Sequence, residues 1–372
     1  MMNDPANYAF DDILHILHFL VERPSLSREE SLTADCLQDL LSFRNIPANR
    51  LLNNVWAVNA SADKSKPTIL LNSHHDTVAP NAQYTRNPYE PVVEGDKMYG
   101  LGTTDAGASL VCLLNAFVEF YHRRDLPFNL LFAASAEEEI SGRNGMEKLF
   151  ANEEFASWFQ HPGSFAIVGE PTQLNLAIAE KGLMVLDCTA TGKPGHAARH
   201  DGVNALYKAM DAIRWIKDYH FEKTSPLLGE VKMTVTSINT KNTAHNIIPE
   251  SCDFVVDIRL NECYSHEEVL QIVREGTGID CVPRSMRLKP SAIEPTHPIV
   301  KAGIALGKSV YGSPTMSDQA LIPLPSLKCG PGFSEQSHSA DEYILLEDLR
   351  AGFHFYPALI NELIKEWPTE TL

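Results

Sequence analysis

Apolar positions along the first half of the chain alternate between helical and strand-like spacing. Residues 10–22 carry apolar groups at helical spacing, and Pro24 ends that pattern. The segment Ser27-Arg-Glu-Glu30 has a capping-box sequence and predicts the start of a second helix. Further along, apolar runs predict strands at 54–58, 68–71, 130–134 and 165–168, with a helix at 108–121. This alternation predicts an α/β sheet with helices covering both faces.

The pattern changes after about Lys181 and returns near Pro290. The middle region predicts a compact βαββα unit, with strands at 183–191, 231–239 and 252–260 and helices at 201–217 and 266–274. Beyond it we predict a helix at 298–309, a strand at 326–329 and a helix at 346–364. We therefore expect an α/β catalytic domain of residues 1–181 and 291–372, interrupted by an α+β (ferredoxin-like) dimerisation or lid domain of residues 182–290.

The amino-acid composition limits which kinds of partner the protein can bind and which cellular compartment we expect for it. The 372 residues include 48 acidic and 31 basic side chains, a formal net charge of −17, which argues against nucleic acid or an anionic membrane as the main partner. The hydrophobic fraction of 44% excludes wholesale disorder. Seven cysteines without a C-x-x-C pair favour a reduced chain. With no signal-peptide pattern and no apolar run of about 18 residues, we expect a soluble, cytoplasmic protein.

The first candidate site follows the predicted strand 68–71, where His74, His75 and Asp76 lie in sequence. Ligands in open α/β sheets bind at the carboxyl ends of strands. Strand alternation places His74 and Asp76 on one side, so Asp76 can accept a hydrogen bond from the His74 ring, and it places His75 on the other side. A polar exit from strand to loop is an equally good explanation of this segment alone.

Other ionisable groups occupy similar places. Asp105 ends a glycine-rich stretch whose spacing does not match a dinucleotide-binding loop, and it could instead cap the following helix. Glu137, Glu138 and Glu139 follow the predicted strand 130–134, where a cation or an exposed helix start would relieve their mutual repulsion. Glu170 follows the strand 165–168, although a solvated turn would explain it. His338 lies in a late loop, where a lone histidine usually has no function.

Taken together, four strand ends with carboxylates or histidine, and a late histidine, predict a metal centre. Carboxylate oxygens with two imidazoles and no thiolate suit Zn²⁺, Co²⁺ or Mn²⁺. Two ions that share one carboxylate need five ligands, one shared and two more on each ion. Such a pair activates water and polarises a carbonyl group.

At this point the sequence resembles the M20 family of co-catalytic zinc aminoacylases and exopeptidases, along nearly the whole chain. The blocks that carry the resemblance occur in the family's order: SHHDTV, YGLGTTDAGAS, AEEEISG, VGEPT, GKPGHAARHDGVNAL and HSADEY. Within the family the likeness is greatest to acetylornithine deacetylase-type members, through AEKGLMVLD and the spacing of SPLLGEVKM before AHNIIP.

The resemblance implies two Zn²⁺ ions and a role for each matching residue. One zinc would be held by His74, Asp105 and Glu170, and the other by Asp105, Glu139 and His338, with Asp105 bridging. Glu138 would be the general base and Asp76 would orient His74, while His75 is not a ligand. Placing the base at Glu138 puts Gly145 where the family has a glycine. The resemblance also implies a cis peptide bond between Asp105 and Ala106.

The resemblance further implies residues in the smaller domain and a substrate class. His196 would reach the active site of the partner in a homodimer and stabilise the oxyanion, and Asn246 and Arg259 would bind the substrate, although Arg259 could simply pair with Asp257. We expect hydrolysis of N-acetylornithine to ornithine and acetate, or of N-acetylcitrulline or an N-succinyl analogue, in arginine biosynthesis. Alternatives are an M20-type dipeptidase, aminopeptidase or carboxypeptidase, and a metal-free binding module.

Overall fold

The computed structural model describes residues 7–367, and the chain divides into two compact units. Among the described residues, unit 1 comprises 7–178, 292–311 and 317–367, and unit 2 comprises Ala179–Ser291 and Gly312–Met316. Three of the four boundaries fall within strands β8 (Leu176–Glu180), β15 (Ser291–Ala292) and β16 (Val310–Ser313), and the fourth follows Met316. Unit 2 is therefore an insertion into the sequence of unit 1.

Unit 1 is built on a mixed sheet with the strand order β1-β2-β6-β3-β7-β17-β8-β15, in which β16 also pairs with β8. Its strands are β1 (Asn49–Leu51), β2 (Asn54–Val58), β3 (Thr68–His74), β6 (Asn129–Ser135), β7 (Phe165–Val168) and β17 (Ser326–Lys328). The neighbours β6, β3, β7 and β17 run parallel. Every residue of β3, β6 and β7 is buried, which explains their continuous apolar sequences. The carboxyl ends of four strands consequently meet at one edge.

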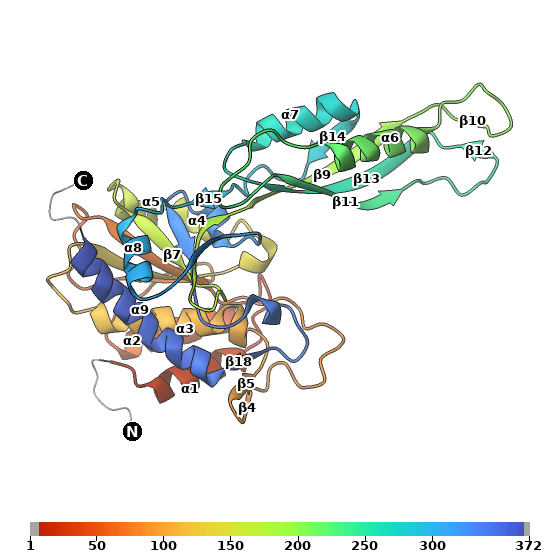
Figure 1. Ribbon diagram of the computed structural model, residues 1–372. Helices are drawn as coiled ribbons and strands as arrows, with labels where there is room; N and C mark the ends of the chain where they lie inside the picture. Colours follow the sequence, from red (N-terminus) through yellow and green to blue (C-terminus); the bar gives the residue numbers. More distant parts are fainter. Residues whose placement is uncertain (1–6, 368–372) are drawn as a thin grey trace. The chain divides into compact units, whose positions relative to one another are not determined.

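Helices cover both faces of this sheet (Figure 1). On one face, α3 (Ala108–Phe120) packs against β3 and β6, and α1 (Phe10–Val21), α8 (Pro298–Ala305) and α9 (Leu346–Glu366) complete the layer. On the other face, α4 (Met146–Phe150) and α5 (Glu153–Ala156) contribute Met146 and Phe155 to a core with Leu70 and Leu131. Helix α2 (Ser31–Phe43) packs against β2. The predicted α/β sheet is confirmed.

The predicted capping box is wrong. Helix α2 begins at Ser31, and neither Ser27 nor Glu30 caps it with a side chain. The Ser27 hydroxyl donates instead to Asp76, and the Glu30 carboxylate accepts from Asn53 and Glu137. Both side chains therefore form hydrogen bonds with residues distant in the sequence instead of capping the helix.

Two other helices are shorter than their apolar patterns. Helix α6 (Ala205–Asp218) starts four residues later than the predicted 201, because the Asn204 side chain accepts from the Leu206 amide and caps it there. Helix α8 ends at Ala305, and Gly307 beyond it has a φ of 79°. This left-handed conformation, which favours glycine, turns the chain out of the helix.

A small antiparallel sheet connects two distant parts of unit 1. It contains β4 (Val92–Glu94), β5 (Lys97–Tyr99) and β18 (Tyr343–Leu345), with Tyr343 opposite Tyr99. The glycine-rich segment after β5 thus lies beside the segment that precedes β18. This pairing brings residues near 105 next to residues near 340.

Unit 2 is a four-stranded antiparallel sheet with two helices. Its strands, in the order β11-β13-β9-β14, are β11 (Lys232–Asn239), β13 (Ser251–Leu260), β9 (Gly182–Thr191) and β14 (Asp280–Pro283). Helices α6 and α7 (His266–Thr277) share a core with this sheet, formed by residues such as Ala209, Val269 and Phe254. Strand β14, with only four residues too short to stand out in the sequence, completes a βαββαβ ferredoxin-like order.

The entry and exit of unit 2 are joined by backbone hydrogen bonds. The Leu183 amide donates to the Leu288 carbonyl at 3.0 Å, and the Lys181 amide donates to the Ser313 carbonyl at 3.1 Å. Strand β9 follows the entry and lies between β13 and β14. The two ends of the insertion are therefore adjacent within the unit itself.

All seven cysteines of the chain are free thiols. Between residues 7 and 367, none of the helices has both the length and the apolar character needed to cross a membrane.

Candidate metal centre

Three of the predicted ligands lie where parallel strands end. His74 is the last residue of β3 and is in register with Ser135, the last residue of β6. Glu139 follows β6 after a short turn, and Glu170 follows β7 by two residues. Strand β7 is in register with β3, since Val168 is opposite Asn72. The sheet therefore delivers these side chains to one edge, as the sequence predicted.

The structure brings all five predicted ligands into two overlapping groups. His74, Asp105 and Glu170 form one, and Asp105, Glu139 and His338 form the other. Within each group one potential ligand atom from every residue lies within 4.8 Å of the others. Asp105 belongs to both groups, which is the relation required of a bridging carboxylate.

The two oxygens of Asp105 face different histidines. Oδ1 lies 3.1 Å from Nε2 of His74, and Oδ2 lies 3.7 Å from Nε2 of His338. On the first side, Oε1 of Glu170 is 3.8 Å from the same His74 nitrogen. On the second side, Oε2 of Glu139 is 2.9 Å from Nε2 of His338. Each oxygen of Asp105 is thus available to a different cation.

Residues that the sequence analysis missed fix the position of Asp105. The buried carboxylate of Glu342 accepts hydrogen bonds from the amides of Gly102 (2.9 Å), Thr104 (2.8 Å) and Asp105 (2.9 Å). The Ser337 hydroxyl donates directly to Oδ2 of Asp105. Both residues flank His338 within or beside the HSADEY block, so their place in that block was the available signal. The peptide bond between Asp105 and Ala106 is cis.

The three successive glutamates have different environments. Glu137 turns away, with its carboxylate accepting from the Asn144 side chain at 2.7 Å. Glu138 is directed to the first group, with Oε2 at 4.0 Å from Nε2 of His74, and Glu139 pairs with His338. The close packing of Gly142 agrees with this, because a Cβ there would lie 2.0 Å from Oε2 of Glu137. The three carboxylates thus have different neighbours: Asn144 beside Glu137, His74 beside Glu138 and His338 beside Glu139.

We expected His75 to face away from the centre and the Asp76 carboxylate to orient the His74 ring. His75 points away from the centre, between the Thr33 hydroxyl (2.8 Å) and the Asn53 carbonyl (2.8 Å). The Nδ1 atom of His74 lies closest to the backbone carbonyl of Asp76 (2.9 Å), while the Asp76 carboxylate is 3.6 Å away. That carboxylate instead accepts from Ser27 and from the amides of Glu138 and Glu139. Asp76 therefore orients the ring chiefly through its main chain.

Burial and crowding of the carboxylates shift their pKa values. Burial, together with the neighbouring charge of Asp105, raises the pKa of Glu170 to about 8. Burial and nearby carboxylates also hold the pKa of Glu138 well above its ordinary value, and burial raises that of Glu139. The hydrogen bond to Glu139 raises the pKa of His338 to about 9. In the metal-free protein, protons therefore occupy groups that cations would otherwise neutralise.

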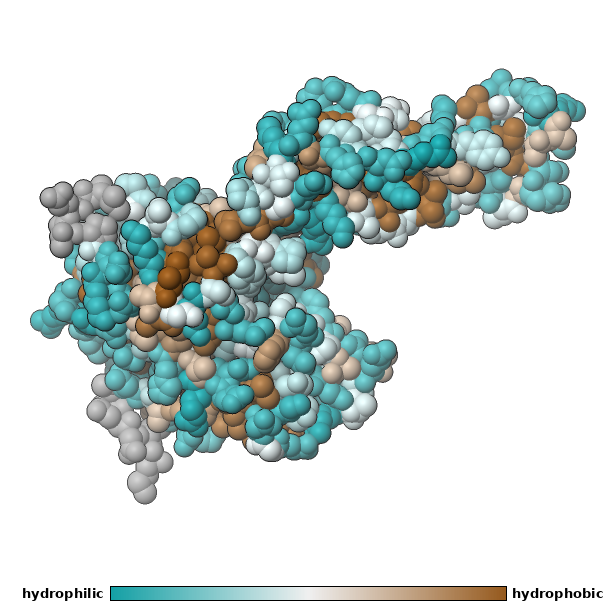
Figure 2. Space-filling model, viewed as in Figure 1, coloured by the Kyte–Doolittle hydropathy of each residue, from teal (hydrophilic) through white to brown (hydrophobic). Residues whose placement is uncertain are grey.

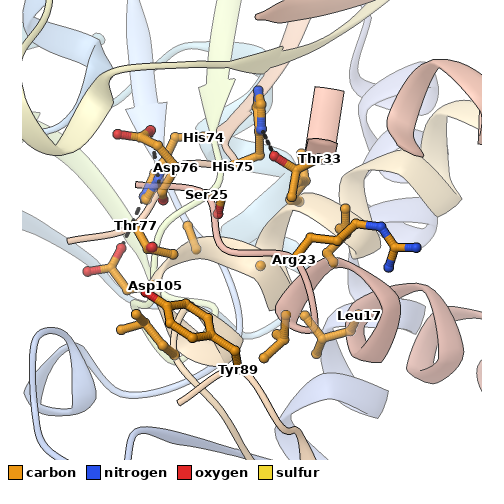
Figure 3. A pocket seen from close by; sticks show the side chains of 17 residues that line it. Leu17, Arg23, Ser25, Thr33, His74, His75, Asp76, Thr77, Tyr89 and Asp105 are labelled. Atoms are coloured by element: carbon orange, nitrogen blue, oxygen red, sulfur yellow. Dashed lines mark hydrogen bonds and ion pairs between the residues drawn. The ribbon is translucent and has the colours of Figure 1, made fainter. Parts of the chain in front are cut away.

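A small cavity of about 30 Å³ adjoins the centre (Figure 3). His74, Asp105 and Thr77 line it together with apolar side chains of α1 and the start of α3, such as Leu17, Leu20 and Leu110. These side chains keep bulk water away from one side of the centre.

Asp318 is a further buried acid that the sequence did not indicate. Its Oδ2 accepts hydrogen bonds from the side chains of Asn72 (2.9 Å) and Ser135 (2.5 Å), which belong to β3 and β6. Burial raises its pKa, and its charge in turn contributes to the raised pKa of Glu138. It ties together the two strand ends that carry His74 and the glutamates.

The three predicted residues of the smaller domain lie in unit 2 and are not gathered into one group there. His196 is exposed in β10 (Gly195–His196), which pairs with β12 (Ile247–Ile248), next to Asn246. Arg259 lies in β13 and forms two hydrogen bonds with Asp257, at 2.8 and 3.1 Å. This pairing is the alternative that the sequence left open for Arg259.

The donor set fits a pair of divalent cations. Two imidazoles and three carboxylates, four of these five residues largely buried, converge around a shared aspartate without any thiolate. Such oxygen and nitrogen donors suit Zn²⁺, Co²⁺ or Mn²⁺. The fold and the centre together have the character of a metallohydrolase.

Comparison with known proteins gives the family. Residues 70–362 match the profile of peptidase family M20/M25/M40, and the chain belongs to this family of hydrolases. It is 26% identical over 401 aligned positions to a probable carboxypeptidase of Paracoccidioides brasiliensis (strain Pb03), covering 97% of this chain and 87% of the relative. It is 27% identical over 342 positions to succinyl-diaminopimelate desuccinylase of Rickettsia bellii (strain OSU 85-389), covering 84% and 85%.

A solved structure supports the fold assignment. The M20-family protein of Bacillus subtilis described as a dinuclear metal-binding peptidase superposes with a TM-score of 0.71 at 16% identity, covering 98% of this chain and 99% of that one. The fold is therefore that of the M20 peptidases, with its mixed α/β catalytic architecture.

The raised pKa values predict that metal binding releases protons. Glu170 and His338, with pKa values of about 8 and 9, hold protons at pH 7 in the metal-free protein, and a cation must displace them. We expect at least two protons to be released per chain at pH 7, because hydrogen bonds to Asp105 and Asp76 also hold the pKa of the predicted ligand His74 well above its ordinary value against the effect of burial. The apparent affinity should rise with pH towards 9. Calorimetric titration with Zn²⁺ in buffers of different ionisation enthalpy measures this release, which should be smaller for His338→Ala. Heats independent of the buffer would contradict the expectation.

Proposed function

We propose that this protein hydrolyses the amide bond of an N-acyl amino acid. N-acetylornithine, cleaved to ornithine and acetate in arginine biosynthesis, is the first candidate, and N-acetylcitrulline or an N-succinyl analogue the next. The observation that carries the proposal is the pair of candidate cation sites around Asp105, with the Glu138 carboxylate beside them. The desuccinylase relative supports cleavage of an N-acyl amide.

The proposed cofactor is a pair of Zn²⁺ ions, with Co²⁺ or Mn²⁺ as possible substitutes. His74, Asp105 and Glu170 would hold one ion, and Asp105, Glu139 and His338 the other. When bound, such ions polarise the scissile carbonyl group and make a water molecule more acidic. The description of the Bacillus subtilis structure as dinuclear metal-binding supports two ions.

Glu138 would carry the proton through the reaction. Its carboxylate lies within the crowded edge of the sheet yet is not one of the five grouped donors. As a base it would take a proton from the attacking water, and as an acid it would return that proton to the departing amine. A pKa raised by burial suits the second task, because the protonated form is then accessible near neutral pH.

Substrate contacts from unit 2 belong to the same proposal. His196 of a partner subunit would stabilise the oxyanion, and Asn246 and Arg259 would bind polar groups of the substrate. For Arg259 this requires its guanidinium group to exchange Asp257 for the substrate, or to bind both. The present pairing holds the side chain in a defined orientation.

A carboxypeptidase or dipeptidase is the second candidate. The fungal relative named as a probable carboxypeptidase covers 97% of this chain, a larger share than the desuccinylase does. Both reactions break an amide bond with the same machinery and differ in the group on each side of it. A metal-free binding module would have no use for five converging metal donors, so we rank it last.

We also propose a homodimer and a cytoplasmic location, where the cysteines would remain reduced. Strand β9 cannot pair with a second subunit through its edges, because β13 and β14 already occupy both of them. Helix α6 exposes Tyr207 (64%) and Met210 (48%) one turn apart, and β11 is an edge strand. Figure 2 shows hydrophobic side chains among hydrophilic ones on the surface of this unit. We therefore propose α6 and β11 as the interface.

A substrate panel tests the reaction. We expect the zinc-loaded protein to hydrolyse N-acetylornithine with a higher kcat/KM than N-acetylcitrulline, N-succinyl-ornithine, N-succinyl-diaminopimelate or dipeptides. Amine release is measured with and without a chelator, and chelation should abolish it. Preference for dipeptides or for acyl-dipeptide carboxyl termini would replace the deacylase by the second candidate.

Replacement of the base separates chemistry from metal binding. For Glu138→Gln we expect two bound metal ions per chain, as in the wild type, and a kcat lower by about 10²–10⁴-fold, because the proton carrier is lost. Glu137→Gln is the matched control, since this neighbouring carboxylate turns away to Asn144, and its activity should stay near wild type. Full activity of Glu138→Gln would remove Glu138 from the mechanism.

The dimer has its own test. A charged residue in the exposed apolar face of α6, as in Met210→Lys, should shift the protein from dimer to monomer in light scattering coupled to size exclusion. Lys217→Glu at the exposed end of the same helix serves as a control for changed charge. A wild-type chain that is monomeric at micromolar concentration would refute the proposed interface.

A further inference from the structure

The segment between α1 and α2 lies against the candidate centre although it precedes it by many residues in sequence. The Ser25 carbonyl accepts from the Thr77 amide at 2.8 Å, and Leu26 forms a parallel bridge with Thr77. Residues 25–30 therefore run alongside the exit of β3, the strand that ends in His74.

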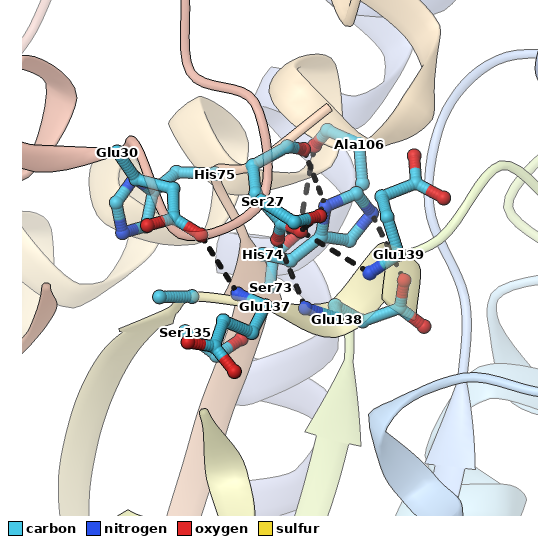
Figure 4. Close-up of polar contacts among 12 residues, drawn as sticks. Ser27, Glu30, Ser73, His74, His75, Ala106, Ser135, Glu137, Glu138 and Glu139 are labelled. Atoms are coloured by element: carbon cyan, nitrogen blue, oxygen red, sulfur yellow. Dashed lines mark hydrogen bonds and ion pairs between the residues drawn. The ribbon is translucent and has the colours of Figure 1, made fainter. Parts of the chain in front are cut away.

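Ser27 connects this segment to Asp76. Its hydroxyl donates to Oδ2 of Asp76 at 2.6 Å, across 49 residues of sequence. The same carboxylate accepts from the amides of Glu138 (Oδ1, 3.0 Å) and Glu139 (Oδ2, 3.2 Å). Ser27 thus orients the carboxylate that holds the backbone of the candidate base and of a candidate ligand (Figure 4).

Glu30 makes the corresponding contact one residue earlier in the glutamate turn. Its Oε1 accepts from the Glu137 amide at 3.2 Å and from the Arg28 amide at 2.5 Å, and its Oε2 accepts from the Asn53 side chain at 2.8 Å. Glu30 is completely buried. Both Glu137 (φ 56°) and Arg28 (φ 80°) have left-handed backbones, and the two amides share one carboxylate oxygen.

Three successive amides of the turn, those of Glu137, Glu138 and Glu139, therefore each have a carboxylate acceptor. The direction of a side chain in so short a turn follows from the rotation of its backbone. A displacement of about 1 Å in a catalytic group can cost a factor of 100 in rate. Acceptors that fix these amides consequently fix where the Glu138 and Glu139 carboxylates lie.

Helix capping does not explain Glu30. It occupies the N-cap position of α2, where a side-chain oxygen would ordinarily accept from the first amides of its own helix. No side-chain capping bond is formed there, and the carboxylate is directed to the glutamate turn instead.

We propose that Ser27 and Glu30 are positioning residues for the glutamate turn, acting through Asp76 and through the Glu137 amide. The proposal rests on the proposed function for the roles of Glu138 and Glu139, but its geometric part concerns the metal-binding turn itself. Removing either contact would let the turn rotate and would move Glu139 relative to His338. The binding of a metal ion should then weaken even where no substrate is turned over.

Cobalt binding provides a readout that does not depend on the substrate. In Ser27→Ala we expect the affinity for the weaker-bound Co²⁺ to fall about 10–100-fold and the visible absorption of the cobalt-loaded protein to change. Ser27→Thr, which keeps the hydroxyl, should restore both. Ser31→Ala, an exposed serine at the start of α2, should behave as wild type. Glu30→Gln should be milder than Glu30→Ala, because it retains an acceptor for the Glu137 amide.

Kinetics on whichever amide the wild type hydrolyses complete the test. We expect kcat of Ser27→Ala to fall about 10–100-fold with KM within threefold of wild type, at unchanged metal content under saturating Co²⁺. Thermal denaturation identifies any variant that fails to fold. An unaltered cobalt spectrum and affinity in folded Ser27→Ala and Glu30→Ala would overturn the proposal. If the wild type cleaved none of the amides but the cobalt results held, the proposed function would fail and the positioning role would stand.

Discussion

The dominant constraint on unit 1 is the clustering of negatively charged side chains at a largely buried edge of its sheet. Asp105, Glu138, Glu139, Glu170 and Asp318 converge where parallel strands end, and their like charges repel one another in a medium of low dielectric constant. Without cations, protons on histidines and carboxylates must offset this charge, which is why Glu170 and His338 have raised pKa values. A fold that keeps such a cluster is one whose stability and occupancy by metal are linked.

Hydrogen bonds from main-chain amides to buried carboxylates hold this cluster in place. Glu342 accepts from three amides of the segment that carries Asp105, and Asp76 and Glu30 accept from three amides of the glutamate turn. In both places the backbone is neither helical nor extended, so its N–H groups lack the acceptors that a helix or a sheet would provide. A side-chain carboxylate accepts their hydrogen bonds instead. The irregular backbone that exposes the metal donors is thereby kept rigid.

Much of this could be predicted from the sequence, for reasons that particular residues make clear. The apolar run of β3 could be told apart from the polar groups that follow it. This is because a buried parallel strand has a mainly apolar sequence until it reaches the edge of the sheet. The five donors could be named because each lies in a short contiguous block that resembles a block of the M20 family. Ser27, Glu30 and Asp318 could not, because each acts on partners tens to hundreds of residues away, and the Ser27–Glu30 pattern matched a helix cap more simply. Strand β14 and the shortened α8 show how a short edge strand or a single left-handed glycine escapes periodicity.

The hydrogen-bonded neck of unit 2, between Leu183 and Leu288, has a consequence for how the chain can fold. Four of the five donors precede the insertion and His338 follows it, so the second cation site is incomplete until the polypeptide has crossed more than a hundred intervening residues. An unstructured loop of that length would add an entropic cost to closing unit 1. Once unit 2 has folded, its ends emerge side by side, and the long excursion acts as a short tether. The folding of unit 2 therefore supplies the free energy that offsets the entropic cost of this long connection. Unit 1 can then fold almost as if its sequence were continuous.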